Sequence, residues 1–174
     1  MRTNTRDLDH IRHVYALVTL PLFDVYQHDI VFIDECSVNA GMVRNYAWAK
    51  VRAPATILHQ DKKDSLTVIV AVTRHGVIHI DIRSDTTTSI VFQDYLVELL
   101  DKIAVSEIGN VIRSQPFVIL DNAPPHKAYA TRDEFERLGI RALTLPPYTP
   151  SFNPAEQFFR SLKSKLRVDL AQRR

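Results

Sequence analysis

The stretch VILDNAPPH (residues 118–126) decides how this chain can fold and what it can do. Three apolar residues lead directly into Asp121, and Asn122, two prolines and His126 follow. Proline fixes φ and has no backbone N–H, so the strand predicted at 116–120 must end in a turn here. The strand therefore delivers a carboxylate to its end, where the acid either caps the turn or takes part in chemistry.

A second apolar run leads into an acid in the same way. VFID (31–34) ends in Asp34, within a strand predicted at 29–35 that is buried on both faces. Removing a carboxylate from water is costly without a partner, so a buried strand does not carry one for stability. Either aspartate alone could cap a turn, but two such cases in one small domain favour a functional explanation.

A third acid, Glu156, lies in SFNPAEQFF (151–159). Asn153 is a candidate N-cap and Pro154 fits the first helical position, so Glu156 falls where a capping box places its carboxylate. If the same helix start faces the sheet, Glu156 is held close to the strand ends instead. The sequence leaves both interpretations open.

The composition is that of a globular protein with a hydrophobic core. The chain has 174 residues, of which 45% are hydrophobic and 24% charged, and one domain is expected. No apolar run approaches the roughly 20 residues that cross a bilayer, and the first ten residues lack the apolar segment of a signal peptide. The single Cys36 excludes an internal disulfide. We expect an intracellular protein, nuclear in a eukaryote or cytoplasmic in a bacterium.

Periodicity and turn residues predict the order of the elements. Helices are expected at 8–20, ended by Pro21, at 88–103, at 131–139 and from about 154. Thr131 and Glu134 form a candidate capping box for the third of these, and Gly139 is expected to stop it. Strands are expected at 29–35, 45–51, 65–74, 76–83, 116–120 and 140–145. An antiparallel meander followed by alternating helices and strands predicts a mixed sheet with helices packed on it.

Three converging carboxylates without a cysteine cluster indicate hard divalent cations, Mg²⁺ or Mn²⁺. Two such ions are the usual device for in-line phosphoryl transfer, and no serine or tyrosine nucleophile is then needed. A phosphatase of the haloacid-dehalogenase type, with Asp34 as nucleophile, is a competing interpretation. It requires a second aspartate two positions later, where the sequence has Cys36.

The segments VFIDE, LDNAPPH and LPPYTPSFNPAEQFFRSLKSKL resemble the three signature blocks of mariner-type transposases. This group belongs to the DDE superfamily and has a ribonuclease-H-like fold. Residues 122–155 separate the second and third acids, a spacing typical of the group, and YAWAK (46–50) resembles its aromatic segment after the first acid. The resemblance covers roughly residues 29–167.

The resemblance implies an α/β fold, with a five-stranded mixed sheet of three antiparallel strands and then parallel strands, flanked by helices. Residues 1–28 would be a helical lead-in and residues 29–174 the catalytic domain. Asp34, Asp121 and Glu156 match the catalytic acids that hold the metals. Asn122 and His126 match the block around the second acid and are expected to support it, although a lone histidine is more often structural. Glu35 is expected to point to the opposite face of the sheet.

The implied function is a metal-dependent DNA transposase or endonuclease. It would cleave DNA phosphodiesters and transfer a 3′ hydroxyl to target DNA, using two Mg²⁺ or Mn²⁺ ions and no organic cofactor. DNA is the expected partner, a homodimer is possible, and no membrane is involved. Family members usually begin with helix-turn-helix modules, which this chain is expected to lack. The alternative is a truncated or co-opted remnant that binds DNA nonspecifically without transposing.

The last segment of the chain is basic. Residues 157–174 hold six lysines and arginines against Asp169 alone, a local charge of +5. Basic side chains on a helix can contact phosphates, or they can simply form its solvated face. The residues expected to contact DNA are Arg160, Lys163, Lys165 and Arg167.

Overall fold

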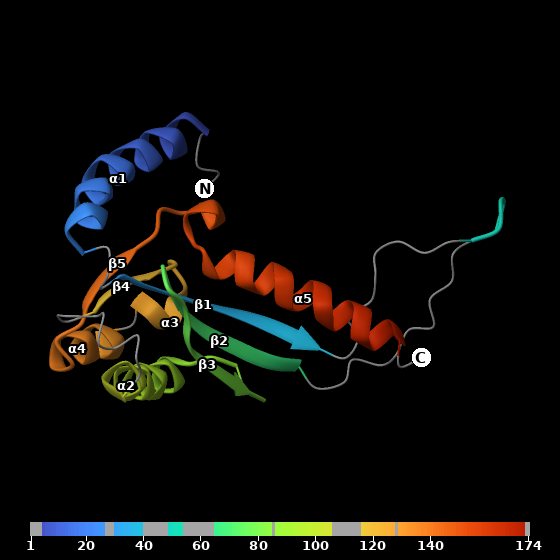
Figure 1. Ribbon diagram of the computed structural model, residues 1–174. Helices are drawn as coiled ribbons and strands as arrows, with labels where there is room; N and C mark the ends of the chain where they lie inside the picture. The colour runs from blue at the N-terminus through green and yellow to red at the C-terminus, as the bar shows by residue number, and fades with distance from the viewer. Residues whose placement is uncertain are drawn as a thin grey trace.

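A single mixed sheet organises the molecule (Figure 1). The computed structural model describes residues 5–26, 30–39, 49–53, 65–84, 86–105, 116–127 and 129–172. The strands are β1 (Ile30–Asn39), β2 (Ser65–Thr73), β3 (Gly76–Arg83), β4 (Phe117–Leu120) and β5 (Arg141–Thr144). Their order is β3-β2-β1-β4-β5, antiparallel among the first three and parallel from β1 to β5. The predicted five-stranded mixed sheet is confirmed.

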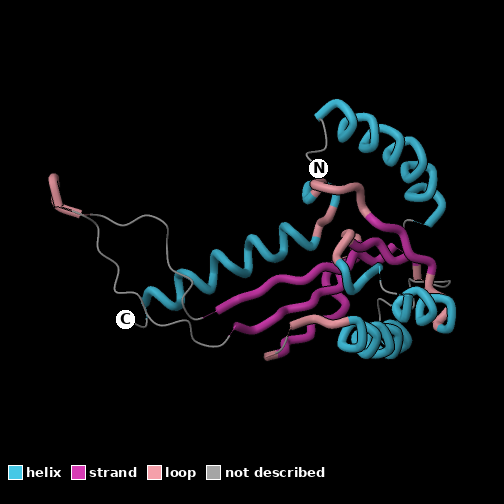
Figure 2. The backbone as a smooth tube through the Cα atoms, turned by 180° about the vertical axis from the view of Figure 1, so that it is seen from behind, coloured by secondary structure: helices cyan, strands magenta, loops and turns pink. Residues whose placement is uncertain are grey.

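Helices cover both faces of this sheet (Figures 1 and 2). They are α1 (Thr5–Tyr26), α2 (Ser89–Val105), α3 (Pro124–Lys127), α4 (Tyr129–Arg137) and α5 (Ala155–Gln172), with a 3₁₀ turn at Pro150–Phe152. One face carries α2, α3 and α4, and the other carries α1 and α5. The structure has no helix long and apolar enough to cross a membrane within the described residues.

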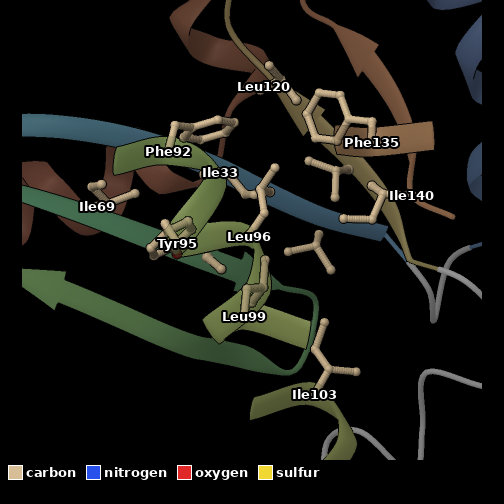
Figure 3. Close-up of a cluster of buried hydrophobic side chains, with 13 residues drawn as sticks. Ile33, Ile69, Phe92, Tyr95, Leu96, Leu99, Ile103, Leu120, Phe135 and Ile140 are labelled. Carbon is tan, nitrogen blue, oxygen red and sulfur yellow. The ribbon is translucent and has the colours of Figure 1, made fainter. Parts of the chain in front are cut away.

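The face under α2 and α4 holds a continuous hydrophobic core (Figure 3). The apolar stripe of α2 meets side chains that alternate along β1, β2 and β4, because residues two apart on a strand share a face. The buried members are Val31, Ile33, Ile69, Ala71, Phe92, Tyr95, Leu96, Leu99, Ile103, Val118, Leu120, Phe135 and Ile140.

The opposite face carries two smaller apolar clusters. One lies under α5 and includes Cys36 of β1 and Phe159 of α5. The other includes Ile30 of β1, and Tyr15 and Phe23 of α1 pack against it. Asp34 lies along β1 between these clusters, so the acid occupies the gap between the two helices of this face.

Helix α1 continues past the proline that was expected to end it. Pro21 cannot donate a hydrogen bond to the carbonyl one turn earlier, yet the helix runs to Tyr26. The turn after the proline is held by packing, since the rings of Phe23 and Phe32 stack with centroids 6.3 Å apart. Tertiary contact therefore outweighs the local preference.

Two further local predictions are corrected by the structure. Within the strand predicted at 45–51, Ala49–Val51 form no strand; Lys50 accepts a hydrogen bond from Ala53 (2.9 Å) in a turn, and residues 45–48 lie outside the described residues. The capping box at Thr131 is also wrong, because α4 begins earlier, at Tyr129, and Thr131 is fully buried within it. The predicted stop is confirmed, with Gly139 in the left-handed region at φ 68°.

Candidate active site

Parallel pairing of β1 with β4 brings the first two acids to the same level of the sheet. The last paired positions are Phe32 and Ile119, and Asp34 and Asp121 each lie two residues further along. The prediction that Asp34 ends its strand is wrong, because β1 continues to Asn39 in its pairing with β2. The adjacency of the two acids follows from the register alone.

The connector between β5 and α5, residues 145–154, covers the sheet at the level of these two acids. Leu145 donates its N–H to Leu120 (2.8 Å), which continues the β4–β5 pairing next to Asp121. The Thr149 hydroxyl donates to the carbonyl of Pro146 (2.6 Å), and Phe152 N–H donates to Thr149 (3.0 Å). These bonds fold the connector into a compact turn that leads into α5.

The start of α5 decides between the two interpretations of Glu156. Asn153 is the cap, since its Oδ1 accepts the N–H of Ala155 (3.1 Å). In a capping box the Asn153 N–H would donate to the Glu156 carboxylate, but it donates to the carbonyl of Pro150 (3.1 Å). The side chain of Glu156 is exposed and is not used to close its own helix. The capping-box interpretation is therefore wrong.

All three acids line one pocket of about 470 Å³. The remaining lining comes from the turn after β4 and from the connector: Asn122, Ala123, Leu145, Pro146, Pro147, Tyr148, Thr149, Pro150 and Asn153. Among the described residues, no three His, Cys, Asp or Glu side chains are close enough to enclose a single ion. The acids surround the pocket without being gathered at one point.

Asp34 is a buried acid of the pocket with a raised pKa. Only 8% of the residue is exposed, and its Oδ1 accepts the backbone N–H of Glu35 (2.9 Å). Burial raises the pKa of Asp34 to about 7; the bond from Glu35 opposes this, and the negative charges of Glu156, Asp121 and Glu35 add to it. Asp34 is thus a carboxyl group surrounded by other acids.

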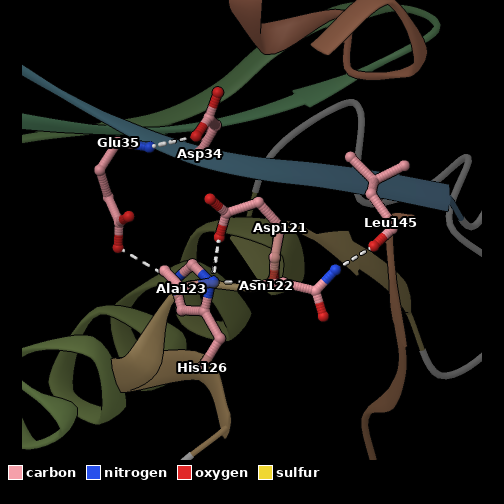
Figure 4. A network of polar contacts seen from close by, with 7 residues as sticks. All are labelled: Asp34, Glu35, Asp121, Asn122, Ala123, His126 and Leu145. Atoms are coloured by element: carbon pink, nitrogen blue, oxygen red, sulfur yellow. Dashed lines mark hydrogen bonds and ion pairs between the residues drawn. The ribbon is translucent and has the colours of Figure 1, made fainter. Parts of the chain in front are cut away.

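Asp121 is held in place by a histidine (Figure 4). Its Oδ1 contacts His126 Nδ1 (2.9 Å) and also accepts the N–H of Ala123 (2.8 Å), so it caps the turn as well as lining the pocket. The other ring nitrogen, Nε2, lies 3.1 Å from Glu35 Oε1. Burial alone would lower the pKa of His126, but its bonds to Asp121 and Glu35 raise it to about 9. A protonated imidazole therefore bridges two carboxylates.

The sequence did not assign this role to Glu35. It was expected to face the opposite side of the sheet from Asp34, and it does, on the face that carries α2 and α3. The short helix α3 lifts His126 to that position, because two prolines suit a first helical turn and His126 N–H bonds to Ala123 (3.1 Å). The adjacency of Glu35 to Asp34 was the available signal, but its partner depends on α3.

Asn122 supports the same corner of the pocket. Its Nδ2 donates to the carbonyl of Leu145, at the beginning of the connector. Asn122, which follows the second acid, is therefore bonded to the connector that leads to the third acid, Glu156.

Basic side chains follow the pocket along α5. Arg160 and Lys165 are exposed, and Lys163 and Arg167 are half-buried. Burial raises the pKa of the Cys36 thiol while the charge of Lys163 opposes the increase, which places Lys163 near β1 beyond Asp34. The stripe formed by Arg160 and Lys163 begins one turn after Glu156.

The donors of this pocket suit a hard divalent cation. Oxygen ligands from several carboxylates are what Mg²⁺ and Mn²⁺ prefer. Burial, and to a smaller extent the negative charges of Glu156, Asp121 and Glu35, raise the pKa of Asp34, so a cation would offset the cost of ionising this buried group. On its chemistry the donor set fits a metal.

Comparison with known families identifies the chain. A family model described as DDE superfamily endonuclease matches residues 29–173. The chain belongs to this family. The matched range includes every strand of the sheet and all three acids of the pocket, and it begins after α1. The family description agrees with the transposase or nuclease class predicted from the sequence.

Individual relatives agree with this assignment. The chain is 31% identical over 103 residues to human histone-lysine N-methyltransferase SETMAR, covering 58% of this chain and 15% of SETMAR. A pre-cleavage Mos1 transpososome matches 95% of this chain and 51% of its own chain, with a TM-score of 0.76 and 22% identity.

The Mos1 catalytic domain with Raltegravir and Mn matches 95% of this chain and 74% of its own, with a TM-score of 0.70 and 22% identity. The chain thus spans about half of the Mos1 transposase chain in the transpososome. The ribonuclease-H-like fold and the mariner-type resemblance are confirmed.

Proposed function

We propose that this chain is the catalytic domain of a mariner-type transposase that cleaves DNA phosphodiesters and transfers a 3′ hydroxyl to target DNA. The observation that carries the proposal is the single pocket lined by Asp34, Asp121 and Glu156. The register of β1 with β4 and the connector before α5 account for that convergence.

The three acids would hold two Mg²⁺ or Mn²⁺ ions. Bound there, the ions would neutralise developing charge and activate the attacking oxygen in an in-line phosphoryl transfer. His126 and Glu35 hold the Asp121 carboxylate in one orientation, and Asn122 ties its neighbour to the connector. Solved Mos1 catalytic domains with Mn and with Mg are consistent with this metal choice.

DNA is the proposed substrate and partner. The stripe that begins at Arg160 continues from the pocket along α5, where positive side chains can contact the phosphates on either side of the bond to be cut. Mos1 structures include a paired-end complex with the left transposon end, which supports a DNA substrate here. A homodimer remains part of the proposal.

Nicking of supercoiled plasmid tests this function. We expect the parent chain to nick DNA with Mn²⁺ or Mg²⁺ and not with EDTA. Asp121→Asn should abolish nicking, while Asp101→Asn, on the exposed side of α2, is the matched control and should leave it unchanged. Nicking that persists in EDTA or in Asp121→Asn would contradict the proposal. A parent chain that binds DNA without nicking it would support the remnant alternative.

A further inference from the structure

Helix α1 precedes the residues matched by the family model, yet it lies beside the connector that lines the acid pocket. A second pocket of about 370 Å³ separates α1 from the turn after β4 and from the connector. Its α1 lining is Ile11, Val14, Tyr15 and Val18. The lining that it shares with the acid pocket is Asn122, Leu145, Pro146 and Pro147. These four shared residues therefore lie between α1 and the acids.

A hydrogen bond and a ring stack join α1 directly to the connector. Arg12 donates from one guanidinium nitrogen to the carbonyl of Tyr148 (2.8 Å). The ring of Tyr15 stacks on Phe152, with centroids 6.0 Å apart and planes 18° from parallel. These contacts hold the middle and the end of the connector, and Asn122 holds its beginning through Leu145.

The Arg12 contact is made at a strained position. Tyr148 has φ 58°, in the left-handed region that bulky L-residues rarely adopt. Such a conformation persists only where its surroundings hold it. The Arg12 guanidinium is itself fixed on the other side by Asp9 (3.1 Å). The chain from Asp9 through Arg12 to the Tyr148 carbonyl thus stabilises a backbone that would otherwise relax.

The conformation of the connector sets the start of α5. Residues 149–153 form consecutive hydrogen-bonded turns, and Asn153 caps the helix, so rotation at Tyr148 is passed on to Glu156. We propose that α1 is a brace of the active site and that Arg12 is a positioning residue, which directs Glu156 into the pocket by holding Tyr148. This inference rests on the proposed function, because it assigns Arg12 an effect on metal binding.

The test measures Mn²⁺ binding without DNA, by the electron paramagnetic resonance signal of free Mn²⁺, alongside melting and nicking. We expect Arg12→Ala to weaken Mn²⁺ binding by about 10-fold, at the low end for residues that orient metal ligands. The melting temperature and the KM for DNA should stay near the parent values. Arg12→Lys, which can still donate to the Tyr148 carbonyl, should recover part of the affinity. Raising Mn²⁺ should restore nicking by Arg12→Ala.

Arg137→Ala is the matched control, because Arg137 also pairs with an acid three residues away but lies on α4, on the other face of the sheet. It should bind Mn²⁺ like the parent. Tyr15→Leu, which removes the stack on Phe152, should shift Mn²⁺ binding in the same direction as Arg12→Ala and by less.

Two results would overturn the brace. Parent-like Mn²⁺ binding by both Arg12→Ala and Tyr15→Leu would show that the connector needs no support from α1. A loss of Mn²⁺ binding that only parallels a fall in melting temperature would show that α1 serves the fold alone. Failure of the proposed function looks different, because the parent itself would then bind no Mn²⁺ or, having bound it, would nick no DNA.

Discussion

The two faces of the sheet are built differently, although the same strands supply both. The face under α2 and α4, called the closed face below, holds one continuous apolar cluster. The face under α1 and α5, called the divided face below, holds two separate apolar clusters with the acid pocket between them. Along β1, Val31 and Ile33 point into the cluster of the closed face, while Asp34 and Cys36 belong to the divided face. Because side chains alternate along β1, one side of this strand contributes to the hydrophobic core and the other side contributes to the acid pocket.

His126 is the point at which the two faces meet. Its ring lies 4.4 Å from the ring of Phe92 in the closed core, and its nitrogens contact Asp121 and Glu35. Asp121 is thereby connected to the apolar cluster under α2 and α4. The comparison predicts that changes on the closed face alter stability and that changes on the divided face alter chemistry.

The largest effect on stability is expected from Phe92→Ala on the closed face. Phe92 is fully buried and contacts the rings of Tyr95, His126 and Phe135, so its removal leaves a cavity. We expect the free energy of unfolding, measured with urea, to fall by about 3–5 kcal/mol. Ile90→Ala, at a position 68% exposed on the same helix, is the control and should change little. A loss below about 1 kcal/mol for Phe92→Ala would contradict a closed core.

The largest effect on chemistry is expected from Glu156→Gln on the divided face. The amide is a poorer ligand for a divalent cation, so nicking should fall by at least about 100-fold, equivalent to about 2.7 kcal/mol in the barrier. The melting temperature should not change, because Glu156 makes no capping bond to Asn153. Asn153→Ala is the contrasting variant and should cost roughly 0.5–2 kcal/mol of stability by loss of the cap. Undiminished nicking by Glu156→Gln would place the third catalytic acid elsewhere.

The elements that sequence predicted well are those whose signals are local. The stripe of α2, the continuous apolar run of β2 and the alternation of β3 can each be read along the chain, and Gly139 stops α4 because few other residues adopt its φ. The acid pocket was also predicted, because the two strand acids and the connector each lie in a segment whose residues can be recognised in the sequence. The resemblance to a known family supplied their pairing.

The elements that sequence missed depend on distant contacts. Packing of Phe23 on Phe32 carries α1 past Pro21, and pairing with β2 extends β1 past Asp34. The bond from Glu35 to His126 joins residues 91 positions apart. The Arg12 contact with Tyr148 spans 136 positions. None of these has a periodicity or a spacing that can be read from one sequence.

Asp34→Asn should stabilise the divided face at high pH. The pKa of Asp34 is raised from 3.8 to about 7, so folding takes up a proton and stability falls as pH rises through this window. Asparagine keeps the acceptor for the Glu35 N–H and carries no charge. At pH 8 we expect a gain on the order of 1 kcal/mol, below the value for the full shift because the pocket is open to solvent.

Thermal unfolding of parent and Asp34→Asn between pH 4 and pH 8 measures this effect. The two melting curves should converge near pH 4, and nicking should be absent in the variant at every pH. Asp169→Asn, at an exposed position of α5, is the control. A clear loss of stability in Asp34→Asn at pH 8 would mean that the carboxylate stabilises the fold and that Asp34 has a structural role.

The smallest effect is expected from replacing a residue of the basic stripe on α5. This prediction compares the two faces by their contribution to DNA binding. Arg160 is exposed one turn after Glu156, so a duplex seated at the pocket would bring a phosphate close to it. Each basic side chain that contacts a phosphate releases about one counterion, and this makes affinity fall as salt rises. Arg160→Gln should therefore reduce the slope of log affinity against log salt by about 1 and weaken binding to unrelated duplexes equally.

Arg137→Gln is the counterpart on the closed face. Arg137 is also exposed, but it belongs to α4 and pairs with Glu134, away from the pocket. Its replacement removes the same charge from the chain, so a general effect of net charge would change both slopes alike. We expect Arg137→Gln to leave the slope at the parent value, because the proposed DNA-binding stripe lies on the divided face. Equal slopes for the two variants, or a preference for one sequence that survives high salt, would show that contacts other than the α5 stripe dominate binding.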